Sequence, residues 1–200
     1  RTGLRLRQYW HLEDKEHTDS QQETIETVRR LVIDAIERQL VSDVPLCTFL
    51  SGGLDSSIIS AVAAQQYARE GKQLETVSVT YRDNAKYFQA SHFQPNSDDS
   101  YIGKMNDAIG ANNHLIVIDT PQLVRALFEA VEARDLPGMA DVDASLLLFC
   151  REIKKIGTVA LSGECADEIF GGYPWYRDAD IRRKAGFPWA QSTQYRASFL

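Results

Sequence analysis

Residues 46–62 read LCTFLSGGLDSSIISAV, an apolar run that passes through two glycines into a second apolar run. The first run has the length and composition of a buried strand, and the second has the apolar spacing of a helix. Between them, Gly52 and Gly53 let the backbone approach a ligand closely, at dihedral angles that other residues resist. The pattern therefore predicts a strand, a tight turn and the start of a helix.

The turn between these runs has the properties of an anion site. The first amides of a helix have no partner within the helix and lie at the positive end of its dipole. Three serine hydroxyls, at positions 51, 56 and 57, add further donors. We expect a phosphate group here, held by amides and hydroxyls, because the turn has neither the lysine of a Walker loop nor the spacing of a dinucleotide fingerprint. The simpler interpretation is an ordinary strand-to-helix turn capped by Ser or Asp.

Asp55 lies within the same turn. A carboxylate beside a phosphate is repelled unless a cation lies between them. Carboxylate and phosphate oxygens are the ligands that Mg²⁺ prefers, so Asp55 predicts a bound Mg²⁺ ion.

The composition indicates one globular protein of the reducing cytosol. The chain has 200 residues, 44% of them hydrophobic, which suits a single domain with a sizeable core. Its net charge of -6 argues against a nucleic-acid surface. Three cysteines are too few and too scattered for a disulfide framework, and no apolar stretch is long enough to span a membrane. We expect a cytoplasmic protein that binds neither nucleic acid nor membrane.

Helices and strands are predicted to alternate along the chain. Helical spacing indicates helices at residues 21–40 (after a capping box from Ser20 to Glu23), 56–69, 100–109, 120–134 and 143–156. Apolar, β-branched runs indicate strands at residues 46–50, 76–81, 115–118 and 158–161. Residues 1–19 read as an extended lead-in, and residues 82–100 as a long loop. This alternation predicts an α/β protein with a buried parallel sheet.

A second motif, SGECADEIFGGY at residues 162–173, follows the last strand directly. Ligands of open parallel sheets bind at the carboxyl ends of the strands, so we expect both motifs to face one crevice. The carboxylates of Glu164, Asp167 and Glu168 are costly to crowd unless a cation or basic group offsets them. Helical spacing would place Glu164 on the same face as Asp167 or Glu168. Alternatively, these acids simply cap the start of a helix.

Four stretches together resemble the glutamine-hydrolysing asparagine synthetase family, within the PP-loop ATP pyrophosphatase group. They are YW at 9–10, SDVP at 42–45, FLSGGLDSS at 49–57 and LSGECADEIFGGY at 161–173. The resemblance implies a doubly wound open parallel sheet of the adenine nucleotide alpha hydrolase-like kind, with helices on both faces. It also implies that residues 1–19 are the tail of a missing N-terminal domain. Residues 20–200 would then be an ATP-binding synthetase domain that is incomplete at its C-terminal end.

The activity implied by this resemblance is ATP-dependent activation of a carboxylate. The side-chain carboxylate of aspartate would attack the α-phosphorus of ATP and release pyrophosphate. Ammonia, supplied from glutamine by an N-terminal glutaminase domain absent from this chain, would then attack the acyl carbon and release AMP. We expect the 200-residue chain alone to be inactive, and a homodimer is the one assembly that we consider.

The same resemblance implies roles for individual residues. Those implied to bind ATP and its pyrophosphate are Leu50 (through its backbone), Ser51, Gly52, Gly53, Asp55, Ser56, Val79, Ser162, Gly163 and Glu168. Asp55 and Asp167 are implied to hold Mg²⁺, and Glu164 is implied to be the base that takes a proton from the attacking ammonia.

Several points stay open. The chain could be an adenylating synthetase that forms a β-lactam or a cyclic peptide with an internal amine, or an ATP- and Mg²⁺-binding module without turnover. Cys165 stands where small residues are usual in the family, and we interpret it as a small packed residue. Asp135, Asp141 and Asp143 flank a Leu-Pro-Gly break, where they are either pocket acids or turn and helix caps.

Overall fold

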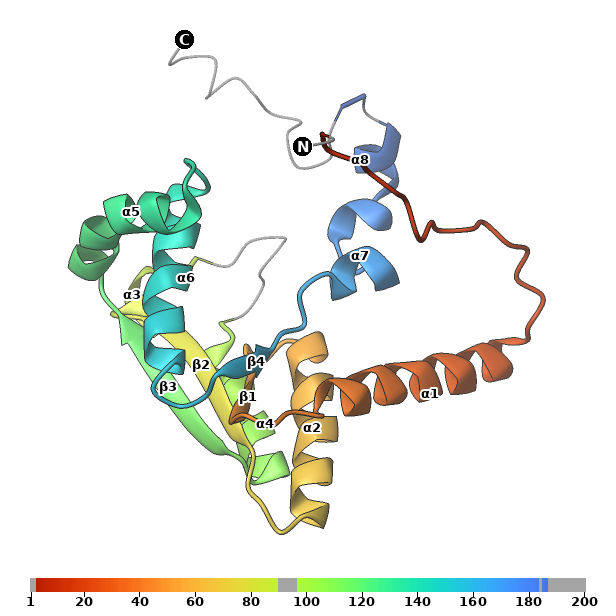
Figure 1. The fold of residues 1–200 in the computed structure, drawn as a ribbon, viewed down its shortest axis with the longest axis horizontal. Helices are drawn as coiled ribbons and strands as arrows, with labels where there is room; N and C mark the ends of the chain where they lie inside the picture. The colour runs from red at the N-terminus through yellow and green to blue at the C-terminus, as the bar shows by residue number, and fades with distance from the viewer. Residues whose placement is uncertain (1–2, 90–96, 184, 187–200) are drawn as a thin grey trace. The chain divides into compact units, whose positions relative to one another are not determined.

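The computed structural model describes residues 3–89, 97–183 and 185–186 (Figure 1). The chain divides into two units, residues 1–35 and residues 36–200, which are described here separately. Helix α1 (Gln21–Gln39) crosses the boundary between them. Its first turn is closed by the predicted capping box: the Ser20 amide donates to Glu23 Oε2 at 2.9 Å, and the Glu23 amide donates to Ser20 Oγ at 3.3 Å.

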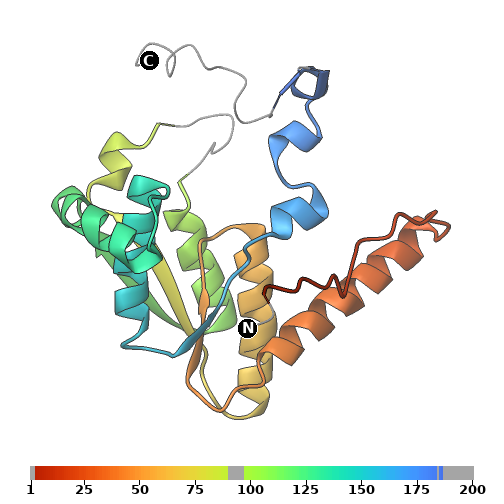
Figure 2. The same cartoon turned by 45° about the horizontal axis from the view of Figure 1, so that its top comes forward.

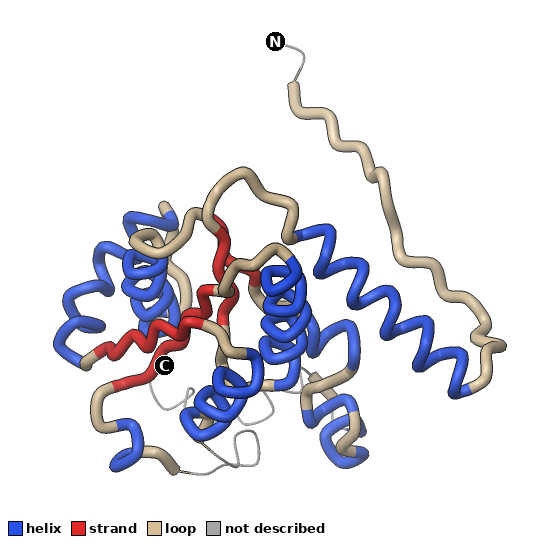
Figure 3. Tube along the Cα trace, turned by 90° about the horizontal axis from the view of Figure 1, so that it is seen from below, coloured by secondary structure: helices blue, strands red, loops and turns tan. Residues whose placement is uncertain are grey.

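The second unit contains a four-stranded parallel sheet in the order β3-β2-β1-β4 (Figure 3). Its strands are β1 (Leu46–Phe49), β2 (Glu75–Tyr81), β3 (Asn112–Ile118) and β4 (Val159–Leu161). All three strand pairs are parallel, so all four carboxyl ends lie at one edge of the sheet. The predicted fold class, an α/β protein with a parallel sheet, is confirmed.

Helices cover both faces of this sheet, and alternation along β1 shows which helix covers which face (Figure 2). The Cys47 side chain packs with Phe149 and Ile153 of α6 (Ala140–Ile153). The next side chain, Thr48, points to the opposite face and is hydrogen-bonded to Ser60 of α2 (Leu54–Arg69) at 2.8 Å. The sheet is therefore doubly wound, with α2 on one face and α6 on the other.

The remaining helices complete these layers or follow them in sequence. They are α3 (Asn84–Tyr87), α4 (Asp99–Ile109), α5 (Thr120–Arg134), α7 (Ala166–Phe170), the 3₁₀ helix η1 (Pro174–Tyr176) and α8 (Ala179–Arg183). Ala126 and Ala130 of α5 pack against Ala144 of α6, so α5 forms an outer layer on that side. The short helix α3 interrupts the loop predicted at residues 82–100, and residues 90–96 of that loop lie outside the described residues.

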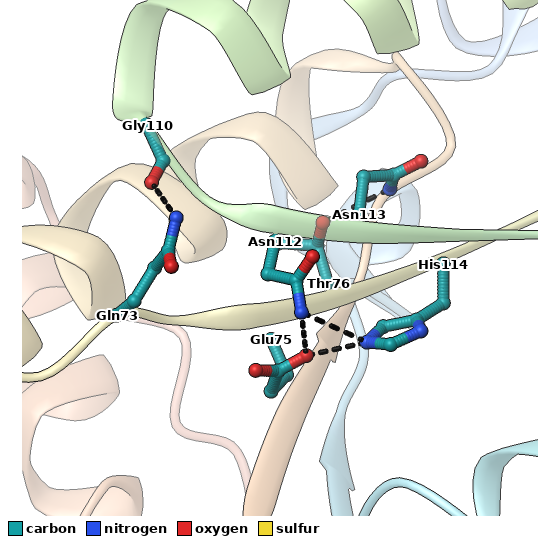
Figure 4. A network of polar contacts seen from close by, with 7 residues as sticks. All are labelled: Gln73, Glu75, Thr76, Gly110, Asn112, Asn113 and His114. Carbon is teal, nitrogen blue, oxygen red and sulfur yellow. Dashed lines mark hydrogen bonds and ion pairs between the residues drawn. The ribbon is translucent and has the colours of Figure 1, made fainter.

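Strand β3 begins three residues earlier than predicted, because polar side chains are satisfied in its first half (Figure 4). The Asn112 amide donates to Glu75 Oε2 at 2.8 Å, and His114 also contacts this carboxylate. The Asn113 amide donates to Thr76 Oγ1 at 2.9 Å. Side-chain bonds across two neighbouring strands thus support a ladder that hydrophobic patterning alone does not predict.

Helix α6 begins at Ala140, three residues before the predicted start, because Asp143 anchors its first turn. The Asp143 carboxylate accepts a hydrogen bond from the Met139 amide at 2.7 Å and pairs with Arg134 of α5. The Asp143 carboxylate therefore anchors the first turn of α6 and also lines a cavity of about 200 Å³ between α5 and α6. Asp135 ends α5 in a left-handed conformation.

Two further expectations can be compared with the described residues. All three cysteines are free thiols, as predicted. No helix in the described ranges is long and apolar enough to cross a membrane.

Truncating Val77 tests the sheet core. Val77 is completely buried, whereas Val117 on the edge strand β3 is 49% exposed. We expect Val77→Ala to lower the free energy of unfolding by about 2–3 kcal/mol, because it leaves a cavity that the core cannot fill. The matched change Val117→Ala should cost no more than about 1 kcal/mol. Urea denaturation measures both, and equal losses would contradict this description of the core.

Candidate active site

The pairing of β1 with β4 brings the two serine–glycine motifs together. Thr48 in β1 lies opposite Leu161 in β4, so both strands end at the same level. A Cβ atom added to Gly163 would lie 3.0 Å from Cβ of Asp55 and 3.3 Å from the Ser56 amide nitrogen. The turn after β4 therefore lies directly against the start of α2, as the strand order requires.

The site is an open surface formed by these two turns. A cavity of about 300 Å³ lies at the opposite edge of the sheet and is lined by β3, α5 and α6. It includes no residue of either motif. The predicted neighbourhood of the motifs is thus confirmed, while a closed crevice between them is not seen in the described part of the chain.

The serines of the first motif bond to each other within the loop. Ser51 Oγ lies 2.9 Å from Ser56 Oγ, the Ser51 amide donates to Ser56 Oγ at 3.2 Å, and the Gly53 amide donates to Ser51 Oγ at 3.3 Å. Helix α2 starts at Leu54, and no side chain caps it. The simpler interpretation, a turn capped by Ser or Asp, therefore does not describe this helix start. The first amides of such a helix lie at the positive end of its dipole, where an anion can bind.

Gly52 is the position where the loop requires glycine. Its φ of +83° is left-handed, and a Cβ atom there would lie 2.9 Å from the Asp98 carbonyl oxygen and 3.0 Å from Tyr101 Cβ. The start of α4 thus supports the loop from the side. This contact could not be predicted from the sequence, because α4 follows a long segment without regular apolar spacing.

Leu50, the residue before the loop, is fixed through its backbone. Its amide donates to the Val77 carbonyl at 2.9 Å, and its carbonyl accepts from Ser78 Oγ at 2.6 Å. Val79, two residues along β2 from Val77, packs partly buried against the cluster on the α6 face. The structure thus ties Leu50 to the sheet and keeps part of Val79 accessible.

Asp55 and Asp167 lie close enough to repel each other. Burial, and secondarily the negative charge of Asp167, raise the pKa of the Asp55 carboxyl. Two carboxylates facing phosphate oxygens form a donor set that suits Mg²⁺, which usually takes one or two carboxylates and completes its shell with phosphate and water. No cluster of three or more metal-binding side chains occurs among the described residues, so a Mg²⁺ ion at these two acids would take its other ligands from phosphate and water.

The second motif forms a turn before its helix begins. Cys165 has a left-handed φ of +70°, and α7 starts only at Ala166. Glu164 therefore lies in an exposed turn, and its predicted position on a helix face with Asp167 or Glu168 is wrong. Cys165 is exposed rather than packed, so that interpretation is wrong too.

Tyr173 connects the acids of this motif. Its hydroxyl donates to Glu168 Oε1 at 3.2 Å, and its ring stacks on Trp175 with centroids 4.3 Å apart. Desolvation, then Glu168, and more weakly Asp167 and Glu164, raise the pKa of the Tyr173 hydroxyl. Tyr173 ends the SGECADEIFGGY motif, but it is not among the site residues predicted from the sequence.

Two glycine variants separate backbone conformation from contact with α4. Gly52 and Gly71 both have positive φ, but only Gly52 is crowded; nothing lies within 4 Å of a Cβ added to Gly71. We expect Gly71→Ala to cost roughly 1–2 kcal/mol through the left-handed backbone. Gly52→Ala should cost clearly more, because it also displaces α4. Similar losses in chemical denaturation would show that α4 does not support the loop.

Removing the charge of Asp55 should stabilise the protein in the absence of Mg²⁺. Because the fold raises the pKa of this carboxyl, its ionised form is disfavoured when folded. The penalty is full above the folded pKa and vanishes below the unfolded pKa of about 3.9. Asp55→Asn should therefore raise the Tm at pH 7 and leave it nearly unchanged near pH 3. A lower Tm at pH 7 would contradict the assigned repulsion.

Residues 27–200 match the protein family described as Asparagine synthase. The match covers most of the chain, so the chain belongs to this family, and the resemblance read from its motifs is confirmed.

Three relatives illustrate the match. The chain is 58% identical to asparagine synthetase [glutamine-hydrolyzing] 3 of Bacillus subtilis over 99% of its own length and 32% of that protein. It is 37% identical to asparagine synthetase [glutamine-hydrolyzing] 1 of the same organism, over 77% of this chain and 22% of that protein. Amidase chyE of Penicillium rubens is 30% identical, over 90% of this chain and 28% of that protein. The chain thus spans about a third or less of the length of these relatives.

Proposed function

We propose that this chain is the ATP-binding synthetase part of a ligase that forms asparagine. It would adenylate the side-chain carboxylate of aspartate with release of pyrophosphate, after which ammonia derived from glutamine gives asparagine and AMP. The observation that carries the proposal is the contact of Gly163 with Asp55, which joins an amide-rich loop to an acid-rich turn. Residues 20–200 would form this domain, preceded by a linker at 1–19.

The loop of residues 51–56 would hold the pyrophosphate portion of ATP. The uncapped amides at the start of α2 point to where an anion can bind. Ser51 and Ser56, which bond to each other at 2.9 Å, would turn their hydroxyls toward phosphate oxygens, while Gly52 and Gly53 let the backbone come close. A loop without lysine suits a departing pyrophosphate better than a transferred γ-phosphoryl group.

The adenosine portion would lie over the ends of β1, β2 and β4. Leu50 would contact it through its backbone, and Val79, Ser162 and Gly163 would line it. These positions follow one another across adjacent strands of the sheet, which supports a single elongated ligand. Glu168, held by the Tyr173 hydroxyl, would support this side of the site.

Asp55 and Asp167 would bind Mg²⁺ between them and the phosphates. The ion would supply positive charge that offsets the negative charge of the phosphate oxygens and of both carboxylates. Burial, and secondarily repulsion from Asp167, raise the pKa of Asp55, and a bound cation would offset both effects. A bound cation would therefore account for the proximity of these two acids, whereas helix capping alone would not.

Glu164 would accept the proton that ammonia loses as the new C–N bond forms. This role needs a carboxylate that reaches the acyl carbon, and Glu164 is exposed in the turn next to the loop. The left-handed Cys165 separates Glu164 from the start of α7.

Exchange of pyrophosphate into ATP tests this function in the full-length protein. We expect exchange that depends on Mg²⁺ and aspartate. Glu164→Gln should retain this exchange but slow asparagine formation by roughly 10²–10⁴-fold, because proton transfer belongs to the second step only.

The same assay distinguishes the alternatives. Exchange that requires a larger carboxylate with an internal amine would indicate a β-lactam- or peptide-cyclising synthetase. Binding of ATP without any exchange would indicate a nucleotide-binding module. Loss of exchange in Glu164→Gln would remove this residue from the amide-forming step.

A further inference from the structure

A row of buried hydrogen bonds runs beneath the loop, from the edge strand to the end of β1. The Asn113 side-chain amide donates to Thr76 Oγ1 at 2.9 Å and to Ser78 Oγ at 3.0 Å. Ser78 Oγ in turn donates to the Leu50 carbonyl at 2.6 Å. Ser78 is 1% exposed and Thr76 is completely buried, whereas Asn113 is half-buried, so the bond from Ser78 to Leu50 is the one most shielded from water. Figure 4 shows Asn113 and Thr76 on their neighbouring strands.

The direction of each bond in this row is determined by chemistry. The Leu50 carbonyl can only accept, so the one hydroxyl proton of Ser78 is committed to it. Ser78 Oγ must then act as the acceptor toward Asn113. The Asn113 amide has two hydrogens, one for Thr76 and one for Ser78, so its orientation is fixed as well.

The bond from Ser78 to the Leu50 carbonyl sets the direction of the next amide in the loop, because a peptide unit is planar and trans. The carbonyl of Leu50 and the amide of Ser51 belong to one such unit and point in opposite directions. With its carbonyl held by Ser78, this unit directs the Ser51 N–H away from the sheet and into the loop, where it donates to Ser56 Oγ at 3.2 Å. A bound phosphate oxygen would replace Ser56 as the acceptor.

We propose that Ser78, held in place by Asn113, is a positioning residue for the pyrophosphate portion of ATP. Neither side chain contacts the ligand. Ser78 holds the Leu50–Ser51 peptide so that the Ser51 N–H is aimed at a phosphate oxygen before ATP binds. This inference rests on the proposed function of the loop, and adds to it two residues from β2 and β3.

A second buried pair on the same face of the sheet provides a matched control. Thr48 Oγ1 and Ser60 Oγ lie 2.8 Å apart, and both residues are completely buried. This pair joins β1 to α2 without contacting the backbone of the loop. Ser60→Ala therefore removes one buried hydroxyl and its hydrogen bond, as Ser78→Ala does, but leaves the Leu50–Ser51 peptide held.

Calorimetric titration with Mg²⁺–pyrophosphate measures the effect in the full-length protein. We expect Ser78→Ala to weaken binding about tenfold, the effect of one misaligned hydrogen bond to a charged group. Ser60→Ala should bind within about twofold of the wild type, although both variants lose similar stability in chemical denaturation.

Asn113→Asp tests the role of the edge strand. Its carboxylate offers Ser78 an acceptor instead of a donor, so the serine hydroxyl should turn from Leu50 toward position 113. We expect a loss of affinity for pyrophosphate similar to that of Ser78→Ala. Combining both changes should give no additional loss, because they break the same row of bonds.

Steady-state kinetics provide a second test, because a general loss of folding stability would not change the KM for ATP selectively. Ser78→Ala should raise the KM for ATP about tenfold, with kcat and the KM for the carboxylate substrate nearly unchanged, because the aimed amide would bind ground state and transition state alike. A loss in Ser78→Ala no larger than in Ser60→Ala would overturn the positioning role. If the wild type itself did not bind Mg²⁺–pyrophosphate, the proposed function of the loop would fail, and this inference with it.

Discussion

The parallel pairing of β1 with β4 places the turn after β1 in contact with the turn after β4, and these two turns differ in chemistry. One turn carries backbone amides and hydroxyls, and the other carries carboxylates. Their contact is tight: a Cβ on Gly163 would lie 3.0 Å from Cβ of Asp55, so a larger residue there would displace its neighbours by a few tenths of an ångström. The same contact partly buries Asp55 and brings Asp167 near it, and burial together with the charge of Asp167 raises the pKa of the Asp55 carboxyl. The pairing of β1 with β4 thus determines the shape of the site and also the electrostatic repulsion between Asp55 and Asp167.

The surrounding fold holds this arrangement from three sides. The start of α4 lies against Gly52, Ser78 holds the peptide that leads into the loop, and Tyr173 holds Glu168. The loop therefore has its amides oriented before any ligand binds, so the binding of a phosphate does not require the loop to be reordered first. The two acids act in the opposite direction, since their repulsion disfavours the fold in the absence of a cation. A ligand that carries both phosphate and Mg²⁺ would bind to the loop amides and also offset the charge of the two acids.

The sequence predicted the sheet and the neighbourhood of the motifs well, because these depend on apolar runs and on glycine turns between them. The predictions were wrong where a single side chain determines the start of a helix or strand. The start of β3 depends on Asn112 and Asn113 bonding across strands, and the start of α6 depends on Asp143, neither of which periodicity reveals. The turn before α7 was missed because Cys165 adopts a left-handed conformation that its residue type does not favour. The support from Ser78 is a contact between residues 28 positions apart, which no local pattern encodes.

The product that receives an oxygen atom from the aspartate carboxylate distinguishes adenylation from γ-phosphoryl transfer at this loop. A loop that retains pyrophosphate implies attack at the α-phosphorus, whereas γ-phosphoryl transfer would release ADP. Aspartate labelled with ¹⁸O in its side-chain carboxylate, incubated with the full-length protein, ATP, Mg²⁺ and an ammonia source, should yield AMP that carries one ¹⁸O atom, together with unlabelled pyrophosphate. Recovery of the label in inorganic phosphate, with ADP as the other product, would contradict adenylation at this site.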